Sequence, residues 1–178
     1  MDINLIKTGD CLLVSGNSWL SKAIKFFTKS KYNHSGIFWW SYGELMVIEE
    51  DMTGYGSVGL IVTRFEDYLN SSKGLLIRRP KFDVDGTNYG RFMQQYLGKL
   101  RYSFWDLIVA QPLYQVSKKI FKNGIWIGGK SLKDGRTVCS GWTYYVYNSF
   151  TKKFEDWFKK SPADLAVDNE FSDLFVRA

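Results

Sequence analysis

Five short apolar segments in the first half of the chain constrain its fold more than any other sequence feature. They span residues 11–14, 35–40, 45–48, 60–63 and 75–77. Segments this short and this apolar, bounded by glycines and polar turn residues, are typical of buried strands. Tyr42-Gly43 separates two of them, and so short a connection joins neighbouring antiparallel strands. The sequence therefore predicts a mostly antiparallel sheet.

Amphipathic helical segments accompany these strands. Apolar residues recur at helical spacing from Trp19 to Phe27, and Asn17 or Ser18 can cap that helix. Further helices are expected at 65–69, from Asp85 to 97, at 103–121 with a break at Pro112, at 138–147 and after Ser161-Pro162, with a short strand at 125–127. Helices packed on a mostly antiparallel sheet define the α+β class. The 178 residues, without repeats or a linker, predict one domain spanning 1–178.

The charge pattern does not favour nucleic-acid binding. The chain has a net charge of +6, but its basic residues are scattered rather than gathered in one stripe. The first residues lack the pattern of a signal peptide, and no apolar run is long enough to span a membrane. We therefore expect a cytoplasmic protein with no transmembrane segment, with export by another route left open as the alternative. No cofactor and no metal are expected. The oligomeric state stays open.

Cys139 is the best candidate for a nucleophile. With only two cysteines, Cys11 and Cys139, the chain does not have a disulfide framework. Thr137 is a good N-cap, which places Cys139 in the first turn of the helix predicted over 138–147. A helix N-terminus favours the thiolate, the nucleophilic form of a cysteine whose ordinary pKa is about 8.5. The competing interpretation is a small buried apolar residue.

The chain contains one histidine, His34, which begins the second predicted strand. An imidazole can take the proton of a thiol when an acceptor orients its other nitrogen. Glu49 ends the next strand and is expected to reach His34 across a hairpin. Glu50 is the alternative, but strand residues alternate between faces, so only one of the two can face the imidazole. The other is then expected to be a solvated charge.

These residues lie in a set of ordered motifs that together resemble a known family. The motifs are Gly9-Asp10, Tyr32-Asn33-His34-Ser35-Gly36-Ile37, Val47-Ile48-Glu49, Tyr96-Leu97-Gly98-Lys99-Leu100-Arg101-Tyr102, Val138-Cys139-Ser140-Gly141-Trp142 and Ser161-Pro162-Ala163-Asp164-Leu165. Their order resembles that of the permuted NlpC-type cysteine peptidases of the papain-like superfamily, and most closely the YiiX-like branch. The resemblance implies a circularly permuted papain-like fold, with a mostly antiparallel sheet or half-barrel packed against helices.

The resemblance also implies roles for individual residues. Cys139 matches the nucleophile, His34 the base and Glu49 the orienting acid. Ser140 and Gly141 are small and would let a substrate approach the backbone, although the branch more often has Cys-Ser-Glu at this point. Tyr32 is expected either to line the oxyanion region or simply to pack.

Two features bear on the substrate. Segment 107–136 is longer and more aromatic than the family pattern, which indicates a family-variable insertion that reshapes or covers the cleft. Aromatic residues make up 17% of the chain, either as core or as an apolar groove.

The implied function is a cysteine hydrolase that cleaves an amide bond of a peptide, including a cell-wall peptide, or an acyl bond, through a Cys139 thioester. One alternative is an acyltransferase or thioesterase acting on lipid-like acyl substrates. Another is a non-catalytic ligand-binding module on the same fold.

Overall fold

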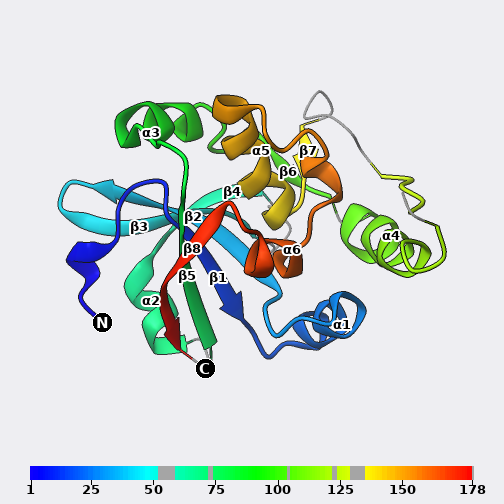
Figure 1. Ribbon diagram of the computed structural model, residues 1–178. Helices are drawn as coiled ribbons and strands as arrows, with labels where there is room; N and C mark the ends of the chain where they lie inside the picture. The colour runs from blue at the N-terminus through cyan, green and yellow to red at the C-terminus, as the bar shows by residue number, and fades with distance from the viewer. Residues whose placement is uncertain (52–58, 72–73, 104, 122–123, 129–134, 178) are drawn as a thin grey trace.

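The computed structural model describes residues 1–178 except 52–58, 72–73, 104, 122–123, 129–134 and 178. Its main feature is a six-stranded sheet in the order β4-β3-β2-β1-β5-β8, in which all five pairings are antiparallel. The strands are β1 (Cys11–Ser15), β2 (His34–Ser41), β3 (Glu44–Asp51), β4 (Gly59–Arg64), β5 (Gly74–Pro80) and β8 (Phe171–Arg177). The prediction of an α+β fold with a mostly antiparallel sheet is confirmed (Figure 1).

The helices lie on both sides of this sheet. They are α1 (Trp19–Thr28), α2 (Phe65–Ser71), α3 (Gly86–Gln94), α4 (Gln111–Ser117), α5 (Cys139–Thr151) and α6 (Pro162–Val167). Short 3-10 turns occur at η1 (Ile3–Leu5) and η4 (Trp157–Lys159), and a π-helical turn, η2 (Asp106–Ala110), precedes α4. No helix in the described ranges is long and apolar enough to cross a membrane.

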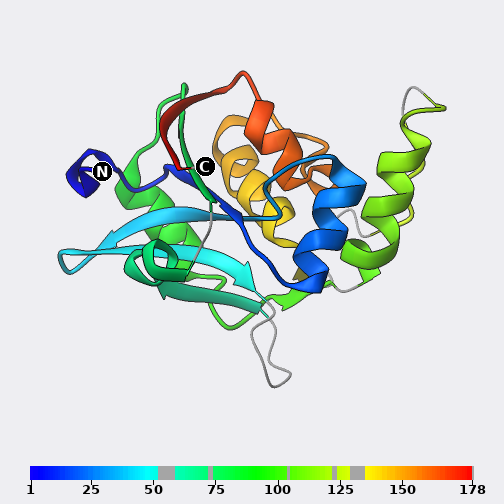
Figure 2. The same cartoon turned by 90° about the horizontal axis from the view of Figure 1, so that it is seen from below.

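Alternating strand residues divide the core into two clusters on opposite faces of the sheet. Cys11 and Leu13 belong to the cluster under α5, which also contains Trp142, whereas Leu12 and Val14 belong to the cluster that contains Phe65 of α2. The sheet thus lies between α5 on one face and α2 on the other (Figures 1 and 2). Because both faces of β1 are buried, its residues form a continuous apolar run in the sequence.

The hairpin between β2 and β3 has the predicted turn at Tyr42-Gly43. Both residues have positive φ, 49° and 81°, the combination that a two-residue hairpin turn matching the twist of its strands requires. The turn fixes a register in which Gly36 pairs with Glu49. His34, two residues before Gly36, is therefore carried to the same end of the hairpin as Glu49.

The helix that carries Cys139 differs from its prediction in its cap and its length. Its N-cap is Val138, not Thr137, and no side chain caps it. Thr137 lies instead in β7 (Arg136–Thr137), which pairs in parallel with β6 (Arg101–Tyr102), and its hydroxyl donates to the Val138 carbonyl at 3.4 Å. Pairing thus holds Thr137 away from the cap position, and the helix continues to Thr151.

Three other segments also differ from expectation. The helix expected over 103–121 is shorter: the π-helical turn Asp106–Ala110 continues directly into α4, which ends at Ser117, and Pro112 does not interrupt it. Residues 125–127 do not form the expected short strand. The edge strand β8 was not anticipated, because its exposed positions interrupt the apolar pattern.

Candidate active site

Cys139 is the first residue of α5, and its side chain is nearly buried. The helix points its unpaired first-turn N–H groups toward this end, and no side chain caps them. Cys139 and Cys11 are both free thiols. Cys11 lies in β1 on the core face, where burial raises the pKa of its thiol far above the usual value. The structure therefore leaves Cys139 as the thiol that borders a pocket, whereas Cys11 is a core residue as expected.

His34 is the first residue of β2 and is half-buried beside α5. Its Nε2 atom lies 2.6 Å from Oε2 of Glu49. Burial by itself lowers the pKa of His34, but the Glu49 carboxylate and the nearby Cys139 outweigh burial and hold this pKa well above its usual value. His34 thus has the Glu49 carboxylate as its hydrogen-bond partner and the candidate nucleophile as a neighbour.

Glu49 is fully buried and has two further partners that the sequence did not reveal. Thr63 of β4 donates its hydroxyl to Oε1 at 2.5 Å, and the Tyr68 hydroxyl of α2 donates to Oε2. Burial by itself raises the pKa of Glu49, but the positive charge of His34 and these hydrogen bonds lower it below the usual value. Glu49 is therefore a buried carboxylate with hydrogen bonds to both oxygens.

Glu50 is also fully buried, which corrects the expectation of a solvated charge. It follows Glu49 in β3 and lies on the opposite face, the one that packs on α5. Among the residues that the structure describes, neither carboxyl oxygen has a hydrogen-bond partner of ordinary geometry, although the Thr137 backbone lies near. Burial, followed by the electrostatic effect of Cys139, raises the pKa of Glu50 well above its usual value. Glu50 is thus a buried carboxyl group whose pKa shifts in the opposite direction to that of Glu49.

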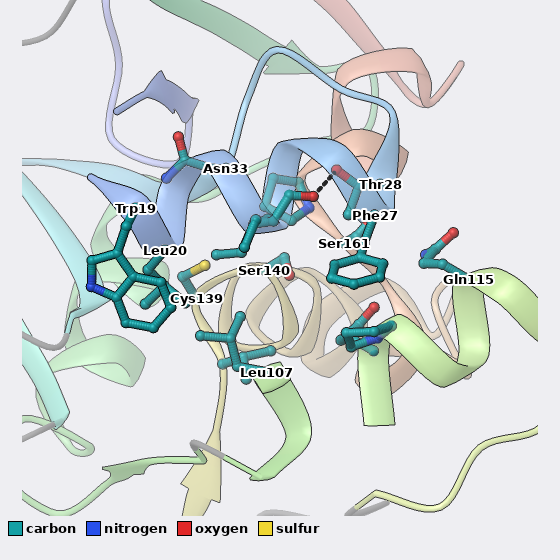
Figure 3. Close-up of a pocket in the computed structure, with 16 residues that line it drawn as sticks. Trp19, Leu20, Phe27, Thr28, Asn33, Leu107, Gln115, Cys139, Ser140 and Ser161 are labelled. Carbon is teal, nitrogen blue, oxygen red and sulfur yellow. Dashed lines mark hydrogen bonds between the residues drawn. The ribbon is translucent and has the colours of Figure 1, made fainter. Parts of the chain in front are cut away.

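An apolar pocket of about 170 Å³ begins at Cys139 and runs between α1 and α4 (Figure 3). Its walls come mainly from apolar residues, namely Trp19, Leu20, Ala23, Ile24, Phe27, Leu107, Pro112, Val138 and Pro162, with a few polar side chains such as Asn33 and Gln115. Figure 3 shows the Cys139 sulfur between Trp19 on one side and Phe27 on the other. A flexible apolar group bound in this pocket would have one end at the thiol.

The residues expected to contact substrate lie in different places. Ser140 lines the pocket, and its hydroxyl donates to the Lys160 carbonyl at 2.8 Å. Tyr32 is buried in the core cluster under α5 and is not part of the pocket wall. Gly141 faces Thr137, since a Cβ added there would lie 2.7 Å from the Thr137 hydroxyl oxygen. The structure therefore brings only Ser140 of these three to the pocket.

Comparisons with known proteins place this chain by its fold. No family model matches the sequence, and no curated protein matches it. Among solved structures, the metalloprotein YiiX from Escherichia coli O157:H7, assigned to DUF1105, is similar with a TM-score of 0.65. The two are 18% identical, and the similarity covers 95% of this chain and 96% of that one. The chain therefore has a YiiX-like fold over nearly its whole length.

Proposed function

We propose that this protein is a cysteine-dependent acyl hydrolase that works through a Cys139 thioester. The observation that carries the proposal is the position of His34, whose Nε2 atom lies 2.6 Å from Oε2 of Glu49 and which is a neighbour of Cys139 at the start of α5. Nucleophile, base and orienting acceptor in this relation activate thiols in unrelated hydrolases.

In the proposed reaction, His34 takes the proton of the Cys139 thiol and the thiolate attacks the carbonyl carbon of the substrate. The first-turn N–H groups of α5 stabilise the oxyanion that forms. The intermediate collapses when His34 gives its proton to the leaving oxygen, nitrogen or sulfur, which departs and leaves the acyl group on Cys139. His34 then takes a proton from water, whose oxygen attacks the thioester and releases the acid. The Cys139 sulfur finally recovers the proton.

The pocket favours an apolar acyl group over a cell-wall peptide. Its walls are mainly aliphatic and aromatic, and they offer few partners for the amide groups of a peptide. An acyl chain, in contrast, has no polar groups that need partners, and burying it in the pocket removes apolar surface from water. The same observation keeps a thioesterase or acyltransferase as the second candidate, because those enzymes form the same acyl-enzyme and differ only in the acceptor or the leaving group.

A resident metal ion is not part of the proposal, although the similar YiiX structure is that of a metalloprotein. Within the described part of the chain, no three His, Cys, Asp or Glu side chains are arranged to hold a metal ion. Nε2 of His34 and Oε2 of Glu49, both good ligand atoms, are bonded to each other. These residues therefore do not fit a metal site, and no step passes through one.

The test is hydrolysis of p-nitrophenyl esters of increasing acyl length, compared with a peptide anilide. We expect turnover that rises with acyl length and disappears in Cys139→Ala and His34→Ala but not in Cys11→Ala. Equal turnover in Cys139→Ala would contradict the Cys139 thioester. A protein that binds acyl ligands without ever turning them over would point to the non-catalytic module instead. A competing alcohol or amine acceptor separates hydrolase from acyltransferase, because only the transferase yields the acylated acceptor.

A further inference from the structure

The net positive charge of the chain is concentrated on the two segments that form the pocket. Residues 16–33 and 107–121 contain six lysines and no arginine, aspartate or glutamate. The rest of the chain contains 18 basic and 18 acidic residues, so these two segments account for the whole net charge of +6. Asp106, immediately before the second segment, is buried. Lys22, Lys29 and Lys31, like Lys118 and Lys119, are exposed.

The same two segments expose large apolar side chains. On α1, Trp19 is 73% exposed and Phe26 is 78% exposed. On α4 and the turn after it, Leu113, Val116, Ile120 and Phe121 are exposed, and Ile120 reaches 74%. Leu113 and Val116 are three residues apart on α4, and Ile120 follows in the turn after the helix, so the three lie in one short segment. Exposed apolar residues gathered on one part of a surface indicate an interaction site.

The helices α1 and α4 pack against each other at one end of the molecule (Figures 1 and 2). Both line the apolar pocket, and two of its wall residues, Trp19 and Phe27, are themselves exposed. We call the exposed apolar and lysine side chains of 16–33 and 107–121 the α1–α4 face. The apolar interior of the pocket and this face are therefore built from the same two helices.

We propose that the α1–α4 face binds the surface of an anionic lipid bilayer. Helices with lysines beside exposed tryptophan and phenylalanine are suited to the interface of a membrane, where rings enter the acyl boundary and lysines meet anionic headgroups. An anionic polymer such as nucleic acid would use the lysines but would leave the aliphatic side chains of Leu113, Val116 and Ile120 in water. The combination of charge and apolar area favours lipid.

Binding in this orientation would place the walls of the pocket against the bilayer. If Cys139 is the nucleophile, a point that rests on the proposed function, an acyl chain of a membrane lipid can pass between α1 and α4 without crossing water. The substrate class is then an acyl lipid taken from a bilayer rather than a dissolved ester. Docking itself needs no chemistry at Cys139, so it is tested separately.

The experiment is flotation of the full chain carrying Cys139→Ala with vesicles of phosphatidylcholine, with or without phosphatidylglycerol. We expect binding to the anionic vesicles, weaker binding at high salt, and little binding to phosphatidylcholine alone. The double variant Phe26→Ser, Ile120→Ser is expected to weaken binding roughly tenfold or more, from the apolar area lost. Lys119→Glu is expected to weaken it about fivefold or more through the lost attraction to anionic lipid.

The matched control is Leu5→Ser, because Leu5 is exposed on η1, away from α1 and α4. It should bind vesicles like the parent, and circular dichroism should show that every variant is folded. Absence of binding to anionic vesicles would overturn the proposal, as would equal loss in the control, or binding that heparin competes for and the apolar variants leave unchanged. Vesicle binding without ester hydrolysis by the unsubstituted chain would instead overturn only the proposed function.

Discussion

Glu49 and Glu50 are neighbours in β3 and are both fully buried, but they lie on opposite faces of the strand and have different surroundings. On the α2 face, Glu49 meets His34, Thr63 and Tyr68, and its pKa is lowered. On the α5 face, Glu50 has no hydrogen-bond partner of ordinary geometry within the described part of the chain, and its pKa is raised. At equal burial, the hydrogen-bond and charge partners of these two glutamates therefore decide the direction in which the pKa shifts.

The largest loss of activity is expected when the imidazole of His34 is removed. His34→Ala takes away the proposed base, so turnover should fall by about 10³-fold or more, close to the level of Cys139→Ala. The measurement is kcat/KM for a long-chain p-nitrophenyl ester. If the double variant His34→Ala, Cys139→Ala is no less active than either single variant, the two residues act as a unit. Fully additive losses in kcat/KM would contradict such a unit.

The next effect separates the two glutamates directly. Glu49→Gln leaves His34 without its carboxylate, and we expect kcat/KM to fall roughly 10²-fold. Glu50→Gln replaces the carboxyl group on the opposite face of β3 with an amide of the same shape, so we expect a change of about threefold or less. Steady-state kinetics of both variants decide the point. If Glu50→Gln proves the more damaging, the assignment of the orienting acid to Glu49 is wrong.

Stability should respond to pH with opposite sign in these two variants. Because the pKa of Glu49 is lowered in the folded protein, its ionised form stabilises the fold above pH 4.5, and this stabilisation is lost as the pH falls. Glu49→Gln should therefore cost about 1–3 kcal/mol in the free energy of unfolding at neutral pH. The raised pKa of Glu50 means that its stabilising neutral form is complete below 4.5 and is lost as the pH rises. Glu50→Gln should therefore gain stability over the parent as the pH rises.

Urea unfolding at acidic and neutral pH measures these differences. The parent protein and both variants are compared at the same pH, so that each difference in the free energy of unfolding comes from the substitution. A Glu50→Gln variant whose advantage shrinks as the pH rises from acidic to neutral would contradict the raised pKa of Glu50 in the folded protein.

The smallest effect is expected at the edge of the Glu49 network. Tyr68→Phe removes one hydroxyl that donates to Glu49 and leaves the His34 and Thr63 contacts in place. We expect a loss of about 1 kcal/mol in the free energy of unfolding and a few-fold loss in kcat/KM. An effect as large as that of Glu49→Gln would show that Tyr68 has a role beyond supporting the carboxylate.

The sequence predicted the strands and the His34–Glu49 pair well because local patterns determine them. Short apolar runs and the Tyr42-Gly43 turn define the β2–β3 hairpin, and its register then places Glu49 near His34. The Thr63 and Tyr68 partners were missed because they come from β4 and α2, and no local spacing links those positions to Glu49.

The errors have the same origin. Thr137 suits a cap by residue type, but the pairing of β7 with β6, a contact between distant segments, removes it from that position. Glu50 appeared to be a solvated charge because a glutamate at a strand end usually is one, whereas α5 covers it here. Segment 107–136 was expected to reshape or cover the cleft, and α4 within it does line the pocket, but the opposite wall on α1 was not foreseen because it lies far away in the sequence.

The most direct test of covalent chemistry at Cys139 is mass spectrometry of the protein mixed with a long-chain acyl ester and quenched within the first turnovers. We predict one acyl group attached to the peptide that contains Cys139, present with Glu50→Gln and absent with His34→Ala. Turnover of the ester with no adduct on Cys139, or an adduct that forms equally well without His34, would contradict the account.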